Sequence, residues 1–310
     1  MPALVTNSKI WGEMFGTEEM QKLFSDEETI LFYLKVEAAL ARSQSSLGII
    51  PKEAGAKITE ACKLDIINWK KLEKRTSIVG YPILPLVEQL SSAVKNGYGQ
   101  YCHWGATTQD IMDTADVLQI RKGLELLSSD LNGIADALVK IIRDHLTTPM
   151  AGRTHLQHAL PVSFGYKAST WLSGIDRHIK RLEEIKSRVF HLSFFGAAGT
   201  LASLGEENGL KTQVALAKEL DLNVPDVSWH SIRDNFSEIT GWLAIVGASI
   251  GKIAYDIMLM MQSEIQEVAE PFLHGRGSSS TMPQKRNPIS SEIMLACSKL
   301  LREQHSSMLD

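Results

Sequence analysis

The sequence is poor in the residues that would tie it to disulfides, zinc or nucleic acid. Its three cysteines are far apart and odd in number, which excludes a disulfide framework and a closely paired zinc site. Lysine and arginine form no basic block and the net charge is −4, so we expect no nucleic-acid partner. These absences favour a reducing compartment and a cytoplasmic protein.

Leader segments and long uncharged apolar runs are also missing. The N-terminal stretch has no basic segment followed by an apolar core, so no secretory signal is expected. The most apolar segment runs from Ile239 to Met261, but Lys252 and Asp256 interrupt it. The remaining uncharged runs are shorter than the ~20 residues of a bilayer span. We therefore expect no membrane association and predict a helix at the centre of a bundle, one that other subunits can complete.

Helical periodicity dominates the chain, and no convincing strand alternation interrupts it, although short hairpins near Phe194 stay possible. Ser25 followed by three acidic residues predicts a helix start, and the pattern continues to residue 47. Small residues such as Gly247 and Gly251 would allow close approach of a second helix. We predict an all-α fold with a smaller N-terminal helical domain over 1–110 and a central helix bundle over 111–310. Long helices are expected at 113–145, 160–190, 209–221, 233–270 and from 289 onward.

Three polar segments break the helical pattern, and the first runs from Tyr101 to Asp110. A glycine, two threonines, an amide and an acid directly before a helix supply capping side chains and free backbone N–H groups. Such a segment suits a carboxylate ligand, but the same residues also suit an ordinary helix cap. Both interpretations stay open on the residues alone.

The second segment, residues 151–161, predicts a short polar turn ahead of a helix that starts near Pro161. Its histidine, His155, suits proton donation or acceptance, because the unperturbed imidazole pKa lies close to neutral pH. The alternative is a histidine that only satisfies backbone groups. His155 and His158 have no third ligand at a suitable spacing, so we expect no metal.

The third segment, residues 275–288, combines two glycines and three serines with Lys285, Arg286 and Asn287. It lacks the ending of a Walker loop. A surface linker would share this composition. The prolines within it and the amphipathic helix that follows favour a loop that closes on an anionic ligand.

These segments resemble the signatures of the fumarase/aspartase superfamily, in the branch of 3-carboxy-cis,cis-muconate cycloisomerase and adenylosuccinate lyase. The matching strings are His103-Trp-Gly-Ala-Thr-Thr-Gln-Asp110, Gly152-Arg-Thr-His-Leu-Gln157 and Ser279-Ser-Thr-Met-Pro-Gln-Lys-Arg-Asn287. Phe195-Gly-Ala-Ala-Gly-Thr-Leu-Ala-Ser203 is more similar to the cycloisomerases. The resemblance implies that Ser279 is a general base, that His155 acts on the acid side and that Glu292 orients His155. It also implies substrate-binding residues, namely His103, Thr107, Thr108, Gln109, Asp110, Arg153, Thr154, Gln157, Lys285 and Asn287, and Arg233 could hold an additional carboxylate.

The resemblance implies an enzyme that moves a proton next to a carboxylate in a small polycarboxylate, without metal or organic cofactor. The cycloisomerase type is preferred, with elimination of the adenylosuccinate lyase type and trans-aconitate decarboxylation as alternatives. A crystallin-like structural protein and a helical interaction module are alternatives of other classes. Members are homotetramers that share active sites, so Ser279 and His155 are expected to be far apart within one chain. A third, C-terminal helical domain of the family is expected to be absent.

The physical logic of such a reaction agrees with these roles. Removing a proton next to a carboxylate places two negative charges on one carboxyl group, so fixed cations and N–H donors must stabilise it. Lys285, Asn287 and loop amides would do so, and they would also lower the pKa of a serine hydroxyl. Motif matching alone selects Ser279 over Ser278 and Ser280.

Overall fold

A computed structural model of the chain describes residues 5–271, 277–279, 281–282 and 284–310. The predicted all-α fold is confirmed, because the described residues are mostly helical and their only sheet is a two-stranded hairpin. The α-helices are α1 (Gly12–Phe15), α2 (Glu18–Leu23), α3 (Asp26–Ser46), α4 (Lys52–Ala61), α5 (Trp69–Val79), α6 (Ile83–Ala93), α7 (Thr108–Asp144), α8 (Phe164–Val189), α9 (Glu206–Leu220), α10 (Asp234–Met260) and α11 (Ile289–Ser307). The strands are β1 (Pro149–Thr154) and β2 (Gln157–Ser163).

The chain divides into two compact units, neither of which is continuous in sequence. Unit 1 comprises residues 1–17, 126–186 and 234–310, and unit 2 comprises residues 18–125 and 187–233. The division predicted from the sequence, between residues 110 and 111, falls in the first turn of α7. That division stays a prediction about domains.

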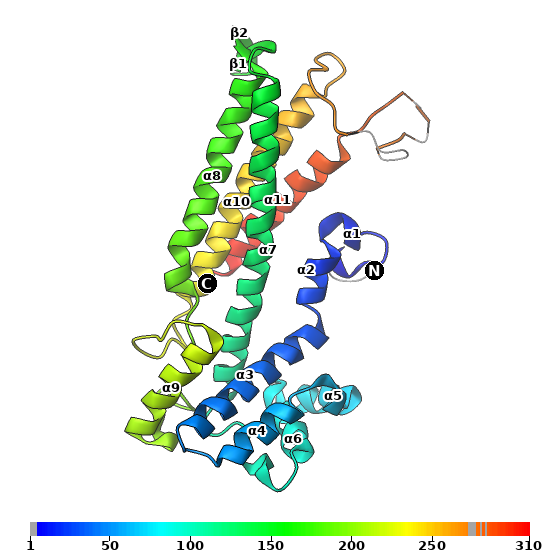
Figure 1. Cartoon of the computed structure of the whole chain (residues 1–310). Coiled ribbons are helices and arrows are strands. Elements are labelled where there is room, and N and C mark those ends of the chain that lie inside the picture. The colour runs from blue at the N-terminus through cyan, green and yellow to red at the C-terminus, as the bar shows by residue number, and fades with distance from the viewer. Residues whose placement is uncertain (1–4, 272–276, 280, 283) are drawn as a thin grey trace. The chain divides into compact units, whose positions relative to one another are not determined.

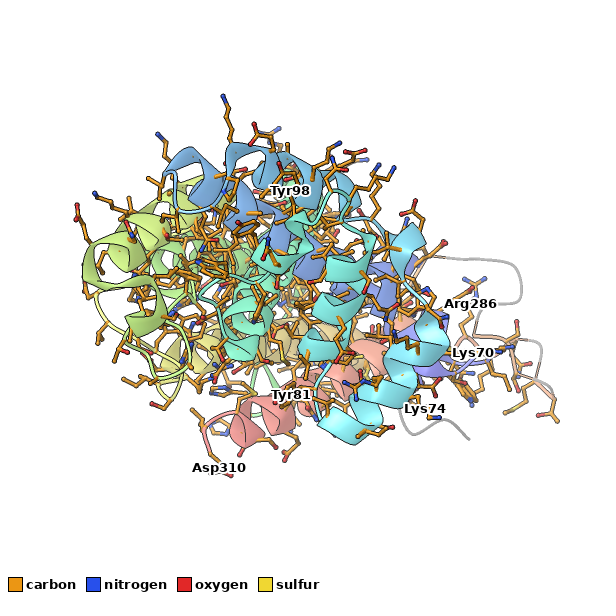
Figure 2. The ribbon with its side chains drawn as sticks, turned by 90° about the horizontal axis from the view of Figure 1, so that it is seen from below. Lys70, Lys74, Tyr81, Tyr98, Arg286 and Asp310 are labelled. Atoms are coloured by element: carbon orange, nitrogen blue, oxygen red, sulfur yellow. The ribbon has the colours of Figure 1, made fainter. Side chains whose placement is uncertain are left out.

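Unit 2 is built around α3, which α4 and α9 contact. The predicted helix start is confirmed, because the Ser25 hydroxyl accepts a hydrogen bond from the backbone N–H of Glu28 at 3.3 Å. The middle of α3 is buried almost completely, which gives this unit its apolar core. Around this core, α5 keeps Leu72 buried while Lys70 and Lys74 project into solvent (Figure 2).

Unit 1 contains the long helices α8, α10 and α11, which lie side by side (Figure 1). The indole of Trp242 donates to the carbonyl of His178 at 3.0 Å, and this contact fixes α10 against α8. α11 approaches α10 closely at Gly247, where a Cβ atom would lie 2.6 Å from Cδ1 of Leu301. The predicted approach of a second helix at the small residues of α10 is therefore confirmed.

By its length and hydropathy alone, α10 could cross a membrane. The core helix of a soluble protein often has the same length and hydropathy, so this observation is weak evidence for a membrane span. In its most apolar window, 33% of the residues are buried within the chain. Ile245 is 50% exposed and Tyr255 is 49% exposed, so α10 presents a large uncovered apolar face.

Two predicted boundaries are wrong. The helix predicted over 233–270 ends at Met260, because the chain turns back there and the N–H of Glu267 bonds to the carbonyl of Met260. The polar turn predicted ahead of Pro161 is the β1–β2 hairpin, and α8 starts only at Phe164. Residues 261–270 contain no glycine or proline that would mark the observed end of α10. Near Phe194, the described residues form only an isolated bridge, between His191 and Asn223.

Candidate active site

The predicted site residues divide between the two units, and each group is described by itself. Unit 1 holds the loop with the predicted base and the hairpin with the predicted acid. Unit 2 holds the segment at the start of α7. The residues are Arg153, Thr154, His155, Gln157, Ser279, Lys285, Asn287 and Glu292 in unit 1, and His103, Thr107, Thr108, Gln109, Asp110 and Arg233 in unit 2.

The described part of the third polar segment is a loop whose two ends are bonded together. The backbone N–H of Asn287 donates to the carbonyl of Gly277 at 3.2 Å, and its side-chain amide donates to the same oxygen at 3.0 Å. Gly277 has a φ of +69°, and a Cβ there would lie 2.8 Å from the carbonyl oxygen of Asn287. Asn287 thus closes the base of the loop, and one of its two amide N–H groups is already used there.

The hydroxyl of Ser279 accepts two backbone N–H groups of its own loop. The N–H of Met282 lies 3.1 Å from Oγ and the N–H of Thr281 lies 3.3 Å from it. N–H donors aimed at an oxygen favour its deprotonated form. Lys285 is exposed, and its ammonium group has no partner among the described residues. Ser280 and Pro283 of the third polar segment lie outside the described residues, as do Gly275 and Arg276.

A carboxylate that sequence reasoning missed anchors the far end of this loop. Glu270 accepts hydrogen bonds from the backbone N–H groups of Ser290 and Ser291, at 3.1 and 2.8 Å, and from the Ser291 hydroxyl at 2.7 Å. Burial alone would raise the pKa of Glu270, but these hydrogen bonds outweigh it and lower the pKa. Glu270 caps α11 and thereby fixes the start of the helix that carries Glu292. Glu292 itself is exposed in the first turn of α11.

His155 occupies the tip of the β1–β2 hairpin. His155 and Leu156 both have positive φ, of 51° and 63°, between the paired residues Thr154 and Gln157. Two left-handed residues form the tight turn that suits a two-residue hairpin, although glycine or asparagine normally occupies such positions. The His155 side chain is exposed, and no hydrogen-bond partner is found for it among the described residues. The hairpin therefore presents its imidazole to the outside.

Arg153 is held by a second acid that sequence reasoning missed. Its guanidinium makes a bidentate pair with Glu267, with N–O distances of 2.8 and 2.9 Å. The Glu267 hydrogen bond is the main cause of a raised pKa of Arg153. Arg153 thus fastens the hairpin to the segment that leads from α10 toward Ser279. A carboxylate ligand at Arg153 would have to share this guanidinium with Glu267.

In unit 2, the start of α7 shows one of the two hydrogen bonds of a capping box. The backbone N–H of Thr107 donates to the Asp110 carboxylate at 3.0 Å, three residues further along. The same carboxylate accepts from the N–H groups of Phe195 and Gly196, both at 2.9 Å, and lies 2.7 Å from Nε2 of His230. Asp110 is completely buried. Its predicted role as a ligand contact has no support in this geometry, because all its lone pairs face the protein.

The amide of Gln109 and the guanidinium of Arg233 are also engaged within the unit. Gln109 donates to the carbonyl of His230 at 2.7 Å and to Asp113 at 3.2 Å. Arg233 makes a bidentate pair with Asp113, with N–O distances of 2.6 and 2.9 Å, and is 39% exposed. Arg233 could therefore hold a ligand carboxylate only by sharing its charge with Asp113.

His103 faces a buried carboxylate. Its Nδ1 lies 2.6 Å from Oε1 of Glu37, a residue in the middle of α3. Burial alone would lower the pKa of His103, but the charge and hydrogen bond of Glu37, with the charge of Asp110, raise it. Glu37 and His230 were missed by sequence reasoning. Glu37 stands in an otherwise regular helical pattern, and the sequence does not show which loop folds onto it.

The protein is helical and carries side chains suited to proton transfer. These are a serine that accepts two backbone N–H groups and two histidines that contact buried carboxylates. A family model described as a lyase matches residues 5–300. The chain belongs to this lyase family, within the fumarase/aspartase superfamily.

Comparisons with individual proteins agree with this placement. The chain is 44% identical over its whole length to trans-aconitate decarboxylase 1 of Mycosarcoma maydis, covering 63% of that protein. It is 42% identical to a 3-carboxy-cis,cis-muconate cycloisomerase of Pseudomonas aeruginosa, covering 94% of the chain and 64% of the relative. The crystal structure of a fumarate lyase from Mesorhizobium sp. BNC1 matches with a TM-score of 0.88 and 52% identity, covering 96% of the chain and 66% of that structure. The chain thus spans a little under two thirds of these relatives.

Proposed function

We propose that the protein catalyses proton transfer at a carbon next to a carboxylate of a small polycarboxylate, with Ser279 as the general base. The observation that carries this proposal is the pair of backbone N–H groups, from Thr281 and Met282, that point at Oγ of Ser279. An ordinary serine is a poor base because its alkoxide is unstable in water. Two N–H donors held by the same loop stabilise that alkoxide.

The reaction follows from this arrangement. In elimination, the C–H bond breaks, the proton moves to Oγ of Ser279, and the electron pair spreads into the neighbouring carboxylate. That pair then forms the double bond while the leaving group departs with its own bonding pair. In cyclisation the same chemistry runs in reverse: a carboxylate oxygen of the substrate adds to the double bond, the electron pair spreads into the neighbouring carboxylate, and the Ser279 hydroxyl returns a proton to the carbon. That carboxylate then bears two negative charges. We assign their stabilisation to the Lys285 ammonium group, which is exposed and has no partner among the described residues. In a decarboxylation, the C–C bond breaks instead, carbon dioxide leaves, and a proton is returned to the carbon. Each reaction passes through a carbanion that a neighbouring carboxylate stabilises.

The names of the relatives narrow the proposed substrate class. trans-Aconitate and 3-carboxy-cis,cis-muconate are both small unsaturated acids with three carboxylates. We therefore propose an unsaturated tricarboxylate as substrate, with cyclisation and decarboxylation as the two candidate outcomes. Elimination from an adenylosuccinate-type adduct is the remaining alternative, and direct assay distinguishes the three.

We further propose that the active protein is a homotetramer with shared sites. An apolar groove of about 830 Å³ runs along α8, α10 and α11 within unit 1, lined by residues such as Gly241, Ala244 and Ile245. A second copy of the chain is the proposed occupant, because the superfamily resemblance implies subunits that join their long helices. The exposed position of His155 is compatible with a site completed by residues of another subunit. A cytoplasmic location stays a prediction.

The test uses the full-length protein and a matched pair of serine variants. Each candidate acid is incubated with the wild type, Ser279→Ala and Ser278→Ala, and the ultraviolet absorbance of the conjugated double bonds is followed. We expect Ser279→Ala to lower kcat by about 10³-fold or more with little change in substrate binding, while Ser278→Ala stays within about tenfold of the wild type. Near-full activity of Ser279→Ala, or the larger loss in Ser278→Ala, would reject Ser279 as the base. No turnover of any candidate acid by the wild type would reject the reaction class.

A further inference from the structure

The carboxylate of Glu37 lies inside unit 2, directly behind the imidazole of His103. Glu37 is 1% exposed, and the neighbouring α3 residues Val36, Ala39 and Leu40 are also buried. Its Oε1 lies 2.6 Å from Nδ1 of His103. Its other oxygen, Oε2, is buried and has no hydrogen-bond partner among the described residues. This carboxylate therefore depends on a single partner.

A buried carboxylate with one hydrogen-bond partner is expected to lower the stability of the fold. A buried carboxylate loses its hydration, and one hydrogen bond replaces only part of it. A leucine of similar size would fill the same position in α3 without that loss. The arrangement instead resembles the way in which a carboxylate holds a catalytic or metal-binding imidazole in one orientation. The presence of Glu37 thus points to a task performed by His103.

The conformation of His103 fits such a task. Its backbone has a φ of +59°, in the left-handed region that non-glycine residues seldom occupy, although asparagine, aspartate and histidine enter it more often than the others. Its side chain is 20% exposed, so the ring lies at the surface of the unit. Because Nδ1 is bound to Glu37, Nε2 is the nitrogen left for a ligand, and it has no partner among the described residues.

We propose that Glu37 is a positioning residue that keeps His103 protonated and turns its Nε2–H outward to bind a carboxylate of the substrate. In this arrangement Nδ1–H donates to Glu37, and Nε2–H donates to the bound carboxylate. The proposal rests on the proposed function, because it assigns the cation for one of the substrate's carboxylates. It adds Glu37, a residue that no motif of the sequence singles out.

The charges around His103 agree with a protonated ring. Glu37 of α3 and Asp110 of α7 both favour the imidazolium form. The nearby thiols of Cys62 and Cys102 are neutral at pH 7, because burial raises the pKa of Cys62 and brings that of Cys102 to about 11. No cation contributes to the pKa of His103 among the described residues. Substrate binding through His103 should therefore weaken as the pH rises through the pKa of this ring.

Glu37→Gln tests the proposal, because the amide keeps the shape of the side chain and removes its charge. The full-length variant and the wild type are compared by kcat/KM as a function of pH and by nuclear magnetic resonance titration of the histidine rings. The His103 signal is assigned by its loss in His103→Asn, since asparagine tolerates positive φ. We expect the pKa of His103 to fall by about one unit or more in Glu37→Gln. The alkaline limb of kcat/KM should move down by the same amount, with about a tenfold loss at pH 8.

Two further variants make the result specific. The double variant Glu37→Gln/His103→Asn should lose no more activity than His103→Asn alone, because Glu37 acts on the substrate only through the His103 ring. Glu60→Gln removes an exposed charge from the same unit, where it forms a salt bridge with Lys57, and should leave the profile unchanged.

The outcomes separate this proposal from the proposed function. An unchanged titration of His103 in Glu37→Gln overturns the proposal, whether or not any acid is turned over. An altered titration with an unmoved kcat/KM profile also overturns it, because Glu37 would then act on His103 without consequence for the substrate. Absence of all turnover in the wild type rejects the reaction class, and the titration still decides whether Glu37 holds the ring protonated.

Discussion

Oδ1 of Asp110 lies 2.7 Å from Nε2 of His230, and the carboxylate is completely buried while the imidazole reaches the surface. The same carboxylate accepts three backbone N–H groups, from Thr107, Phe195 and Gly196. Asp110 therefore joins three segments that are far apart in the sequence. Its contribution should be to stability and to the orientation of His230.

Replacing Asp110 by asparagine should destabilise the protein strongly. The amide NH2 group would face N–H donors, and the negative charge that attracts them would be lost. We expect the free energy of unfolding in urea to fall by about 2–4 kcal/mol. Asp226→Asn, an exposed change in the same unit, is the control and should have an effect of less than about 0.5 kcal/mol. A normal stability of Asp110→Asn together with a raised KM would instead support the direct ligand contact predicted from the sequence.

Because of Asp116, we predict that the free energy of unfolding falls as the pH rises through about 6. A carboxylate in a salt bridge normally has the opposite effect. Burial, and then the charge of Asp113, raises the pKa of Asp116 to about 6, although Arg233 opposes this shift. The folded protein thus holds a proton that the unfolded chain releases near pH 4. The stability contributed by this proton is complete below about pH 4 and is lost as the pH rises through about 6.

Asp116→Asn should remove this dependence, because an amide stays neutral at every pH. We expect a gain of about 1–2 kcal/mol in unfolding free energy at pH 7.5, after allowance for solvent screening, and little difference at pH 4. Urea unfolding at the two pH values measures the difference. Asp130→Asn, on the exposed surface of α7, is the matched control. A loss of stability at pH 7.5 would show that Asp116 is ionised and usefully paired.

The uncovered face of α10 predicts a change of oligomeric state. Ile245 is 50% exposed and lines the groove between the long helices of unit 1. Ile245→Glu should place a charge in a contact between subunits and dissociate the assembly. Analytical ultracentrifugation of the full-length protein would then show smaller species, with activity lost in parallel if sites are shared.

Ile78→Glu provides the control for this prediction. Ile78 is 68% exposed on α5 of unit 2, so the change adds the same charge to a different apolar position. It should leave the assembly intact. An unchanged sedimentation coefficient of Ile245→Glu would reject α10 as the subunit contact.

The helices that are determined by residues close together in the sequence could be predicted from the sequence. The start of α3 follows from the Ser25 cap, and the long helices follow from apolar periodicity, so the predicted ranges of α7, α8 and α9 agree with the observed ones to within about five residues at each end. The end of α10 could not be predicted. Residues 261–270 are compatible with a helix, and the chain turns there through contacts with distant residues, such as the pairing of Glu267 with Arg153.

The candidate site shows the same limit. The sequence motifs indicate which side chains suit anion binding and proton transfer, but they do not indicate which of those side chains another residue already holds. Asp110 and Arg233 were predicted as ligand contacts, and both are bound by partners within unit 2. Glu37 and Glu270 stand outside the motifs, and their roles depend on which backbone folds onto them. A motif shows which chemical groups are present. Only the tertiary structure shows which of those groups are already hydrogen-bonded to other residues of the protein.

The tight approach at Gly277 has a consequence for mutational surveys of this protein. Any side chain at this position is excluded twice, by the left-handed backbone and by the carbonyl oxygen of Asn287. A saturation library would therefore score position 277 as no more tolerant than position 279, although glycine has no group to offer a substrate. A substitution in this loop can therefore reduce activity either because the loop no longer folds or because catalysis is lost. Measuring the amount of folded protein together with growth or activity separates the two causes.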